Sequence, residues 1–193
     1  MKVVKQSKQS QALAIRTIKA GGVVVFPTDT VYGLICDAFN KKAVEKIFKI
    51  KKRPKGKSIS IFVNDLKSAK EFAKINLKYE KFLKKSWPGA ITAVLKPKRK
   101  LPPNISQGKG TIGVRVPNYK LIDGLILKNK APLAETSANI SGQPATTKIN
   151  EVLNYFIDAK FRPDLIIDAG NLPERGPSKV VDLTGDKIKI LRP

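Results

Sequence analysis

The stretch "NKKAVEKIFKIKKRPKGKSISIFV", residues 40–63, joins a helix pattern to a strand pattern through a basic turn. Asn40 is a suitable N-cap, and the apolar residues after it recur at helical spacing, so we predict a helix over 40–51. In "SISIFV" the isoleucines and the valine fall on one face and Phe62 on the other, which predicts a strand over 58–63. This order of elements indicates an α/β fold.

The basic turn partly matches a phosphate-binding P-loop, at Gly56-Lys57-Ser58. The match fails because a P-loop needs a glycine five residues before Gly56, and position 51 is lysine. A P-loop also runs from a strand into a helix, so that main-chain N–H groups and the helix dipole meet the phosphates. Here the order is reversed, so side chains must supply any binding in this turn.

The rest of the chain shows the same interleaving of helices and strands. The apolar run 23–26 is typical of a central strand in a covered sheet, and the last two predicted strands are close enough to form a hairpin. We therefore predict a single α/β domain over 1–193 with a mixed sheet. Helices are predicted over 8–20, 65–86 (in two pieces), 119–128 and 148–158, strands over 90–95, 112–116, 132–135, 164–168, 179–183 and 187–191, and loops over 96–110 and 136–147.

Composition leaves the meaning of the charge open. The formal net charge is +23, and lysine outnumbers arginine by 31 to 7. A field of this sign attracts polyanions such as tRNA, but the lysines are spread along the chain, which equally fits a general lysine bias. The single cysteine suits a reducing compartment, and the chain has no 18-residue apolar run and no apolar signal core at its N-terminus. We expect a cytoplasmic protein that does not enter the membrane.

The chain contains no histidine. This excludes Ser-His-Asp and Cys-His catalysis, histidine general bases and most transition-metal sites. Any catalysis is therefore expected to rest on positioning and positive charge.

Four polar segments lie near the ends of predicted strands or helices, where ligands of open α/β sheets commonly bind. Taken singly, each also fits an ordinary structural role, as a turn former, a helix cap, a solvated helix end or a strand start. Arg115 is the only arginine in an apolar strand, and since burying it without an anion is costly, a ligand role is favoured. The segments are "PTDTVYG" (27–33), "KKRP" (51–54), "TSANISG" (136–142) and "GPSKVVD" (176–182).

Together with three further motifs, these segments resemble the YrdC-like family of threonylcarbamoyl-AMP synthases. The likeness covers nearly the whole chain and consists of seven motifs in order. They are "FPTDTVYGL" (26–34), "KKRP" (51–54), "WPGAIT" (87–92), "VRVP" (114–117), "SANISG" (137–142), "SKVVD" (178–182) and "ILRP" (190–193).

The resemblance implies a twisted open mixed sheet with helices on both faces and a large, positively charged concave cavity, in the short, single-domain form of the family. It implies an enzyme that joins L-threonine, bicarbonate or CO2 and ATP into threonylcarbamoyl-adenylate and pyrophosphate. The product would serve the modification of tRNA adenosine 37 by a separate transferase machinery. Mg2+ is expected with ATP, held mainly by phosphates and water, with no metal-ligand set made by the protein alone.

The resemblance also implies roles for individual residues. Lys51 and Arg53 are the expected catalytic residues, and an extended turn would direct both into the cavity. Phe62 stands where many members have a histidine, and Cys36 beside the first motif fits a small buried hydrophobe. The expected threonine and bicarbonate contacts are Thr28, Thr30, Tyr32 and Ser178, and the expected nucleotide contacts are Lys51, Arg53, Arg115, Ser137, Asn139 and Arg192.

Two other functions remain in competition. One is a non-catalytic protein of the same fold that binds double-stranded RNA or tRNA, for which RNA affinity would depend steeply on salt. The other is a carbamoyl-transfer module of a larger maturation enzyme. The full set of polar motif residues favours the synthase, because an RNA-binding protein has no need of all of them.

Overall fold

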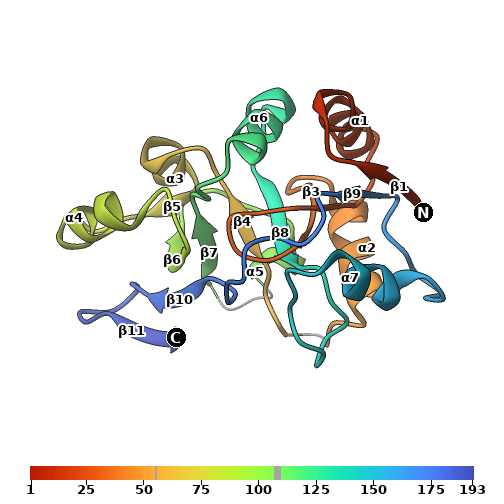
Figure 1. Ribbon diagram of the computed structural model, residues 1–193. Helices are drawn as coiled ribbons and strands as arrows, with labels where there is room; N and C mark the ends of the chain where they lie inside the picture. The colour runs from red at the N-terminus through yellow and green to blue at the C-terminus, as the bar shows by residue number, and fades with distance from the viewer. Residues whose placement is uncertain (55, 107–109) are drawn as a thin grey trace.

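The structure, a computed structural model, describes residues 1–54, 56–106 and 110–193. Its helices are α1 (Lys8–Lys19), α2 (Lys41–Lys51), α3 (Leu66–Phe72), α4 (Leu77–Ser86), α5 (Pro103–Ser106), α6 (Lys120–Asn129) and α7 (Ile149–Phe156) (Figure 1). Its strands are β1 (Lys2–Lys5), β2 (Val24–Phe26), β3 (Gly33–Asp37), β4 (Ser60–Phe62), β5 (Ala73–Lys74), β6 (Ile91–Pro97), β7 (Ile112–Arg115), β8 (Leu133–Ser137), β9 (Leu165–Asp168), β10 (Lys179–Asp182) and β11 (Lys189–Arg192).

The strands form one mixed sheet in the order β1-β9-β2-β3-β8-β4-β7-β6-β10-β11, with β5 paired to β6 beside this path. The sheet contains parallel pairs, such as β4–β7 and β6–β10, and antiparallel pairs, such as β3–β8 and β6–β7. The predicted α/β class and the predicted hairpin of the last two strands, β10 and β11, are confirmed. The strand predicted to be central, β2, lies inside the sheet between β9 and β3.

Helices cover both faces of the sheet, as predicted, but they cover them unequally. Side chains alternate between the faces along a strand, so Val24 and Phe26 pack in one core with α1 and α6, while Val25 packs in another. The second core is the larger and contains buried side chains from α2, α3, α4, α5 and α7. On the first face only α1 and α6 contribute core residues among the described helices, which leaves part of that face open.

The open part lies over β4, β7 and β8. Phe62 pairs with Leu133 and Arg115, and Phe62 and Leu133 belong to the core beneath α6. Two residues back along β4, Ser60 pairs with Gly113 and Glu135 on the same face. Cross-strand partners point to the same side, so these residues form a floor next to the covered core.

The local sequence signals are confirmed where they are strongest. The side chain of Asn40 accepts a hydrogen bond of 3.0 Å from the Ala43 N–H and caps α2, which ends where Lys52 takes a left-handed conformation with φ 48°. Strands β1, β3 and β5 and helix α5 were not predicted; β1 is a largely exposed edge strand and β5 has only two residues. Residues 107–109 of the predicted loop 96–110 lie outside the described residues.

Strand β8 runs two residues further than predicted, to Ser137. The extension pairs with β3, where Gly33 lies opposite Ser137.

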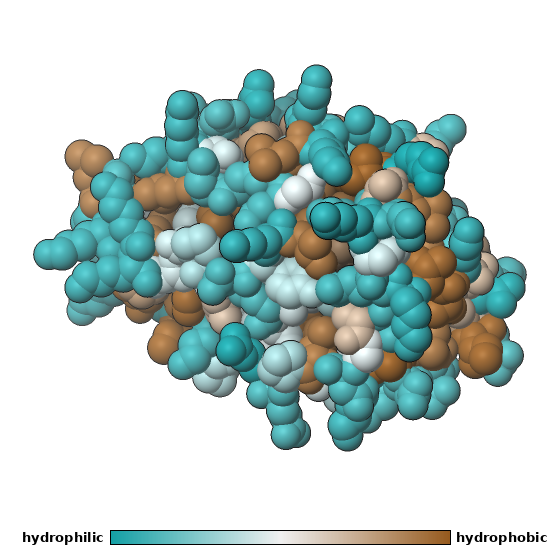
Figure 2. Space-filling model, turned by 45° about the horizontal axis from the view of Figure 1, so that its top comes forward, coloured by the Kyte–Doolittle hydropathy of each residue, from teal (hydrophilic) through white to brown (hydrophobic). Residues whose placement is uncertain are grey.

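Hydrophilic side chains cover most of the face seen in Figure 2, with apolar patches between them. In the described part of the chain, no helix is long and apolar enough to cross a membrane.

Candidate active site

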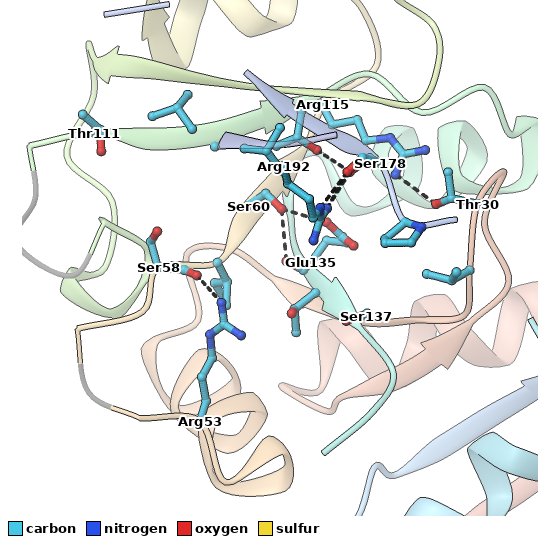
Figure 3. A pocket seen from close by; sticks show the side chains of 18 residues that line it. Thr30, Arg53, Ser58, Ser60, Thr111, Arg115, Glu135, Ser137, Ser178 and Arg192 are labelled. Atoms are coloured by element: carbon cyan, nitrogen blue, oxygen red, sulfur yellow. Dashed lines mark hydrogen bonds between the residues drawn. The ribbon is translucent and has the colours of Figure 1, made fainter. Parts of the chain in front are cut away.

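A cavity of about 210 Å³ lies on the open part of the sheet (Figure 3). Its walls come from β4, β6, β7, β8, β10 and β11 and from the turns after β2 and α2. Its charged lining residues are Arg53, Arg115, Glu135 and Arg192. Its lining hydroxyl residues are Thr30, Ser58, Ser60, Thr92, Thr111, Thr136, Ser137 and Ser178.

Arg115 is 2% exposed and forms a buried ion pair, Nη2 to Asp29 Oδ1, at 2.7 Å. Its Nε donates to the Gly89 carbonyl oxygen at 3.0 Å, and its Nη1 donates to Thr30 Oγ1 at 3.1 Å. A buried Arg115 was expected to need an anionic partner, and Asp29 is that partner. Arg115 holds the turn after β2 against β7, and its predicted contact with the nucleotide stays a prediction.

The residues of the "PTDTVYG" segment divide between the cavity and its support. Thr30 lines the cavity, and its N–H donates to Thr28 Oγ1 at 3.0 Å within the turn. The Tyr32 hydroxyl donates to the Gly170 carbonyl oxygen at 2.6 Å and accepts from the Ala169 N–H at 3.0 Å. Burial raises the pKa of Tyr32 to about 12. The Thr28 hydroxyl therefore holds its own turn in place, and the Tyr32 hydroxyl holds the segment after β9.

Lys51 is the last residue of α2 and is 1% exposed. Its Nζ donates to the Ser137 carbonyl oxygen at 2.6 Å, to the Asn139 carbonyl oxygen at 2.8 Å and to Asn139 Oδ1 at 2.9 Å. All three donors of the ammonium group are engaged. Burial and, to a smaller extent, the nearby Arg53 charge lower the pKa of Lys51 to about 7, against the opposing effect of the Glu135 charge.

Arg53 lies on the cavity wall. Its Nη2 donates to the Ser58 carbonyl oxygen at 2.6 Å, and its Nε donates to the Lys57 carbonyl oxygen at 3.3 Å. Burial lowers its pKa, and the Glu135 charge opposes this. The expectation that Lys51 and Arg53 would both face the cavity holds only for Arg53, because Lys51 remains helical and the left-handed turn falls at Lys52.

Ser137 and Asn139 occupy the turn that Lys51 anchors. Ser137 lines the cavity and its Oγ donates to Asn139 Oδ1 at 2.6 Å. Asn139 is 7% exposed, and its amide donates to the carbonyl oxygens of Ile140 and Gln143. Asn139 thus shapes the turn that presents Ser137.

Ser178 and Arg192 close the cavity from the side of β10 and β11. Arg192 donates to the Ser178 carbonyl oxygen from Nε at 2.9 Å and from Nη2 at 2.6 Å. The hydroxyls of Ser178 and Thr92 share a hydrogen bond of 2.8 Å. Burial lowers the pKa of Arg192, which Figure 3 shows across the cavity from Arg53.

Glu135 and Ser60 also line the cavity and were not predicted from the sequence. Glu135 lies at the centre of Figure 3, and its Oε2 accepts a hydrogen bond of 2.8 Å from Ser60 Oγ. The one sequence signal for Glu135 is a charge at the end of the predicted apolar strand 132–135, whereas in the structure Glu135 lies inside β8.

Phe62 occupies a place that the resemblance assigns to a histidine, and it is fully buried. The Arg115 guanidinium lies 5.6 Å from the centroid of its ring. Phe62 therefore supports Arg115 from beneath and belongs to the core, not to the cavity wall.

The cavity can bind anions by its side chains. Arginine offers planar, forked donors that match carboxylates and phosphates, and hydroxyls can complete their hydrogen bonding. Within the described residues, no group of three or more His, Cys, Asp or Glu side chains is arranged to hold a metal ion. The fold and these side chains define an α/β protein with a cavity suited to anionic ligands.

Comparison with known proteins identifies the family. A family model described as "Telomere recombination", for the Sua5, YciO and YrdC proteins, matches residues 16–193. A Methanocaldococcus jannaschii protein is 34% identical over 177 residues, covering 92% of this chain and 82% of that protein. The threonylcarbamoyl-AMP synthase of Pyrococcus abyssi is 36% identical over 182 residues, covering 94% of this chain and 53% of that protein. The chain belongs to the Sua5/YciO/YrdC family.

Solved structures agree with this assignment. The crystal structure of Pyrococcus abyssi Sua5 complexed with L-threonine has a TM-score of 0.89 and 34% identity, covering 100% of this chain and 56% of that chain. The crystal structure of Escherichia coli YciO has a TM-score of 0.86 and 27% identity, covering 99% of this chain and 92% of that chain. The chain thus spans about half the length of the Pyrococcus abyssi relative and most of the length of YciO.

Proposed function

We propose that this protein is a threonylcarbamoyl-AMP synthase. It joins L-threonine, bicarbonate or CO2 and ATP into threonylcarbamoyl-adenylate and releases pyrophosphate. Membership of the family and the likeness to a threonine complex of Pyrococcus abyssi Sua5 support this activity. The observation that carries the proposal is a cavity lined by Arg53, Arg115 and Arg192 together with hydroxyl side chains.

The reaction needs positioning more than it needs a nucleophilic side chain. The threonine ammonium group releases two protons to solvent and keeps one, and its nitrogen forms a bond to the carbon of CO2 as one C–O π bond breaks onto oxygen, which yields an N-carboxylate. An oxygen of this carboxylate attacks the α-phosphorus of ATP, and the bond from that phosphorus to the β-phosphate breaks, so pyrophosphate leaves. Both partners are anions, so the site must neutralise their repulsion and hold them in line.

We assign the charge-neutralising role to the arginines at the two sides of the cavity. Arg53 and Arg192 have guanidinium groups on opposite walls, where they suit the phosphates and the carboxylates. Thr30 and Ser178 offer hydroxyls to threonine, and Ser137 offers one to the nucleotide.

Lys51, Asn139, Thr28 and Tyr32 act as positioning residues, since their polar groups are engaged within the protein. Arg115 orients Thr30 through its hydrogen bond and its ion pair with Asp29.

Magnesium would enter with ATP. The lining fits such an ion because Mg2+ prefers oxygen ligands and keeps several waters, so phosphates, water and a hydroxyl such as that of Ser137 would suffice. When bound, the ion would neutralise charge on the triphosphate. The protein's own contribution remains the arginines and the shape of the cavity.

The product is expected to serve tRNA. A separate transferase machinery would take the threonylcarbamoyl group to adenosine 37, which implies a cytoplasmic setting and no membrane partner. Direct contact with tRNA or double-stranded RNA is compatible with the charge of +23.

Pyrophosphate release tests the proposal. Purified protein receives ATP and Mg2+, and L-threonine and bicarbonate are omitted in turn. We expect release only when both are present. Release that is indifferent to threonine, or no release, would refute the synthase activity, and RNA affinity measured against salt would then test the RNA-binding alternative.

A further inference from the structure

Glu135 places a carboxylate in a cavity whose other charged lining residues are arginines. Among the described residues it is the one acid that lines the cavity. Strand β8 holds it on the floor, opposite Ser60, which in turn pairs with Gly113 on the same face of the sheet. Because Gly113 has no side chain, the space above this floor stays open.

The Glu135 carboxylate makes no direct ion pair among the described residues, although its charge acts on the nearby Lys51, Arg53 and Arg192. Its Oε2 accepts from the uncharged Ser60 hydroxyl, and within the described residues it forms no ion pair with an arginine. The arginines have other partners: Arg53 donates to the Ser58 carbonyl oxygen, and Arg192 donates to the Ser178 carbonyl oxygen. Oε1 has no hydrogen-bond partner among the described residues. The cavity thus presents separate positive and negative groups.

Such a cavity matches a zwitterion. An α-amino acid carries a carboxylate, which suits a guanidinium, and an ammonium group, which needs an acceptor of negative charge. We propose that Glu135 binds the α-ammonium group of the amino-acid substrate and so selects an amino acid over an analogue without the amine. This inference rests on the proposed function and adds a specificity-determining residue to it.

The competing occupant at Glu135 is a divalent cation bound with ATP. The ammonium group is favoured because Glu135 is a single carboxylate with one oxygen already committed to Ser60. An ammonium group needs only one strong acceptor with two neutral ones, such as the hydroxyls that line this cavity. A Mg2+ ion that enters with ATP takes most of its ligands from phosphates and water, so it does not require Glu135, whereas an ammonium group does require an acceptor of negative charge.

Isothermal titration of the full chain separates these possibilities. The ligands are L-threonine, 2,3-dihydroxybutanoate with the same side-chain configuration, and ATP with and without Mg2+. The variants are Glu135→Gln, which keeps an acceptor for Ser60, and Asp158→Asn as the charge-matched control. Asp158 is exposed just after α7, which packs against the other face of the sheet.

We expect the wild-type protein and Asp158→Asn to bind L-threonine about tenfold or more tightly than the dihydroxy acid, as a hydrogen bond between charged groups requires. Glu135→Gln should lose most of this preference by weakening threonine alone, with ATP affinity and its response to Mg2+ unchanged.

Unchanged threonine affinity in Glu135→Gln would overturn the inference and leave the proposed function standing. A loss confined to ATP with Mg2+ would overturn it in favour of the cation. Failure of the wild-type protein to bind threonine at all would refute the proposed function and the inference together.

Discussion

The ammonium group of Lys51 donates to Asn139 twice, at 2.8 Å to its carbonyl oxygen and at 2.9 Å to its side-chain oxygen. With a third bond to the Ser137 carbonyl oxygen, it ties the end of α2 to the end of β8. The two ends carry Arg53 and Ser137 into one cavity. A lysine that is 1% exposed therefore sets the spacing of two candidate ligand groups.

The burial of Lys51 predicts a pH dependence of stability. Burial lowers its folded-state pKa from 10.5 to about 7, so between these values the unfolded chain binds the extra proton. Stability therefore rises with pH across this window, by at most about 1.4 kcal/mol per pH unit from this group. Urea denaturation from pH 6.5 to 9.5 should show a steeper rise for the wild-type protein than for Lys51→Met. Parallel curves would mean that the lysine is not desolvated.

Arg53 is expected to be required for chemistry and not for folding. Its guanidinium lines the cavity, so Arg53→Ala should lower adenylate formation roughly 100-fold or more, as the loss of one charge-stabilising donor does. The control is Lys52→Asn, which removes the neighbouring charge and tolerates the left-handed conformation. Circular dichroism should show both variants folded. Near-wild-type activity in Arg53→Ala would remove this residue from the site.

The ion pair between Arg115 and Asp29 is expected to stabilise the turn after β2. The side chains are 2% and 7% exposed, so Asp29→Ala leaves a buried, unpaired guanidinium and should cost about 3–5 kcal/mol of unfolding free energy. The double variant Asp29→Ala/Arg115→Met should cost less than Asp29→Ala alone, and chemical denaturation of all forms completes the cycle. Additive effects would show that the two charges do not interact.

Tyr32 is expected to act on stability. Tyr32→Phe keeps the ring but strands the Gly170 carbonyl oxygen and the Ala169 N–H, so it should cost about 1–3 kcal/mol. Threonine affinity should change little, because the hydroxyl is engaged with Gly170 and Ala169 and Tyr32 is not among the residues that line the cavity. A large loss of threonine affinity with unchanged stability would instead make Tyr32 a substrate contact.

The fold was predictable where local signals decide it. The cap at Asn40 and the apolar spacing after it predicted α2 nearly to the residue. Strand β3 was missed because "GLICD" has neither alternation nor a turn signal, and its place is fixed by long-range pairing with β2 and β8. The extension of β8 to Ser137 has the same non-local origin.

Some of the motif residues line the cavity and others do not, because the motifs do not show where each side chain points. Thr30, Arg53 and Ser178 line the cavity, whereas Lys51 from the same motifs is turned inward. Lys51 is turned inward because it is still part of α2, which ends at this residue. The periodicity of apolar residues does not fix the end of a helix to a single residue. Glu135 was missed because the sequence does not reveal that β8 crosses the open part of the sheet.

If this cavity joins threonine, bicarbonate and ATP, the carbon of bicarbonate must appear in the adenylate. The most direct measurement is mass spectrometry of the products formed from 13C-bicarbonate, L-threonine, ATP and Mg2+ by the wild-type protein and Arg53→Ala. We expect a labelled threonylcarbamoyl-adenylate from the wild-type protein and a severely reduced amount from the variant. An adenylate without the label, or equal yields from the two proteins, would contradict it.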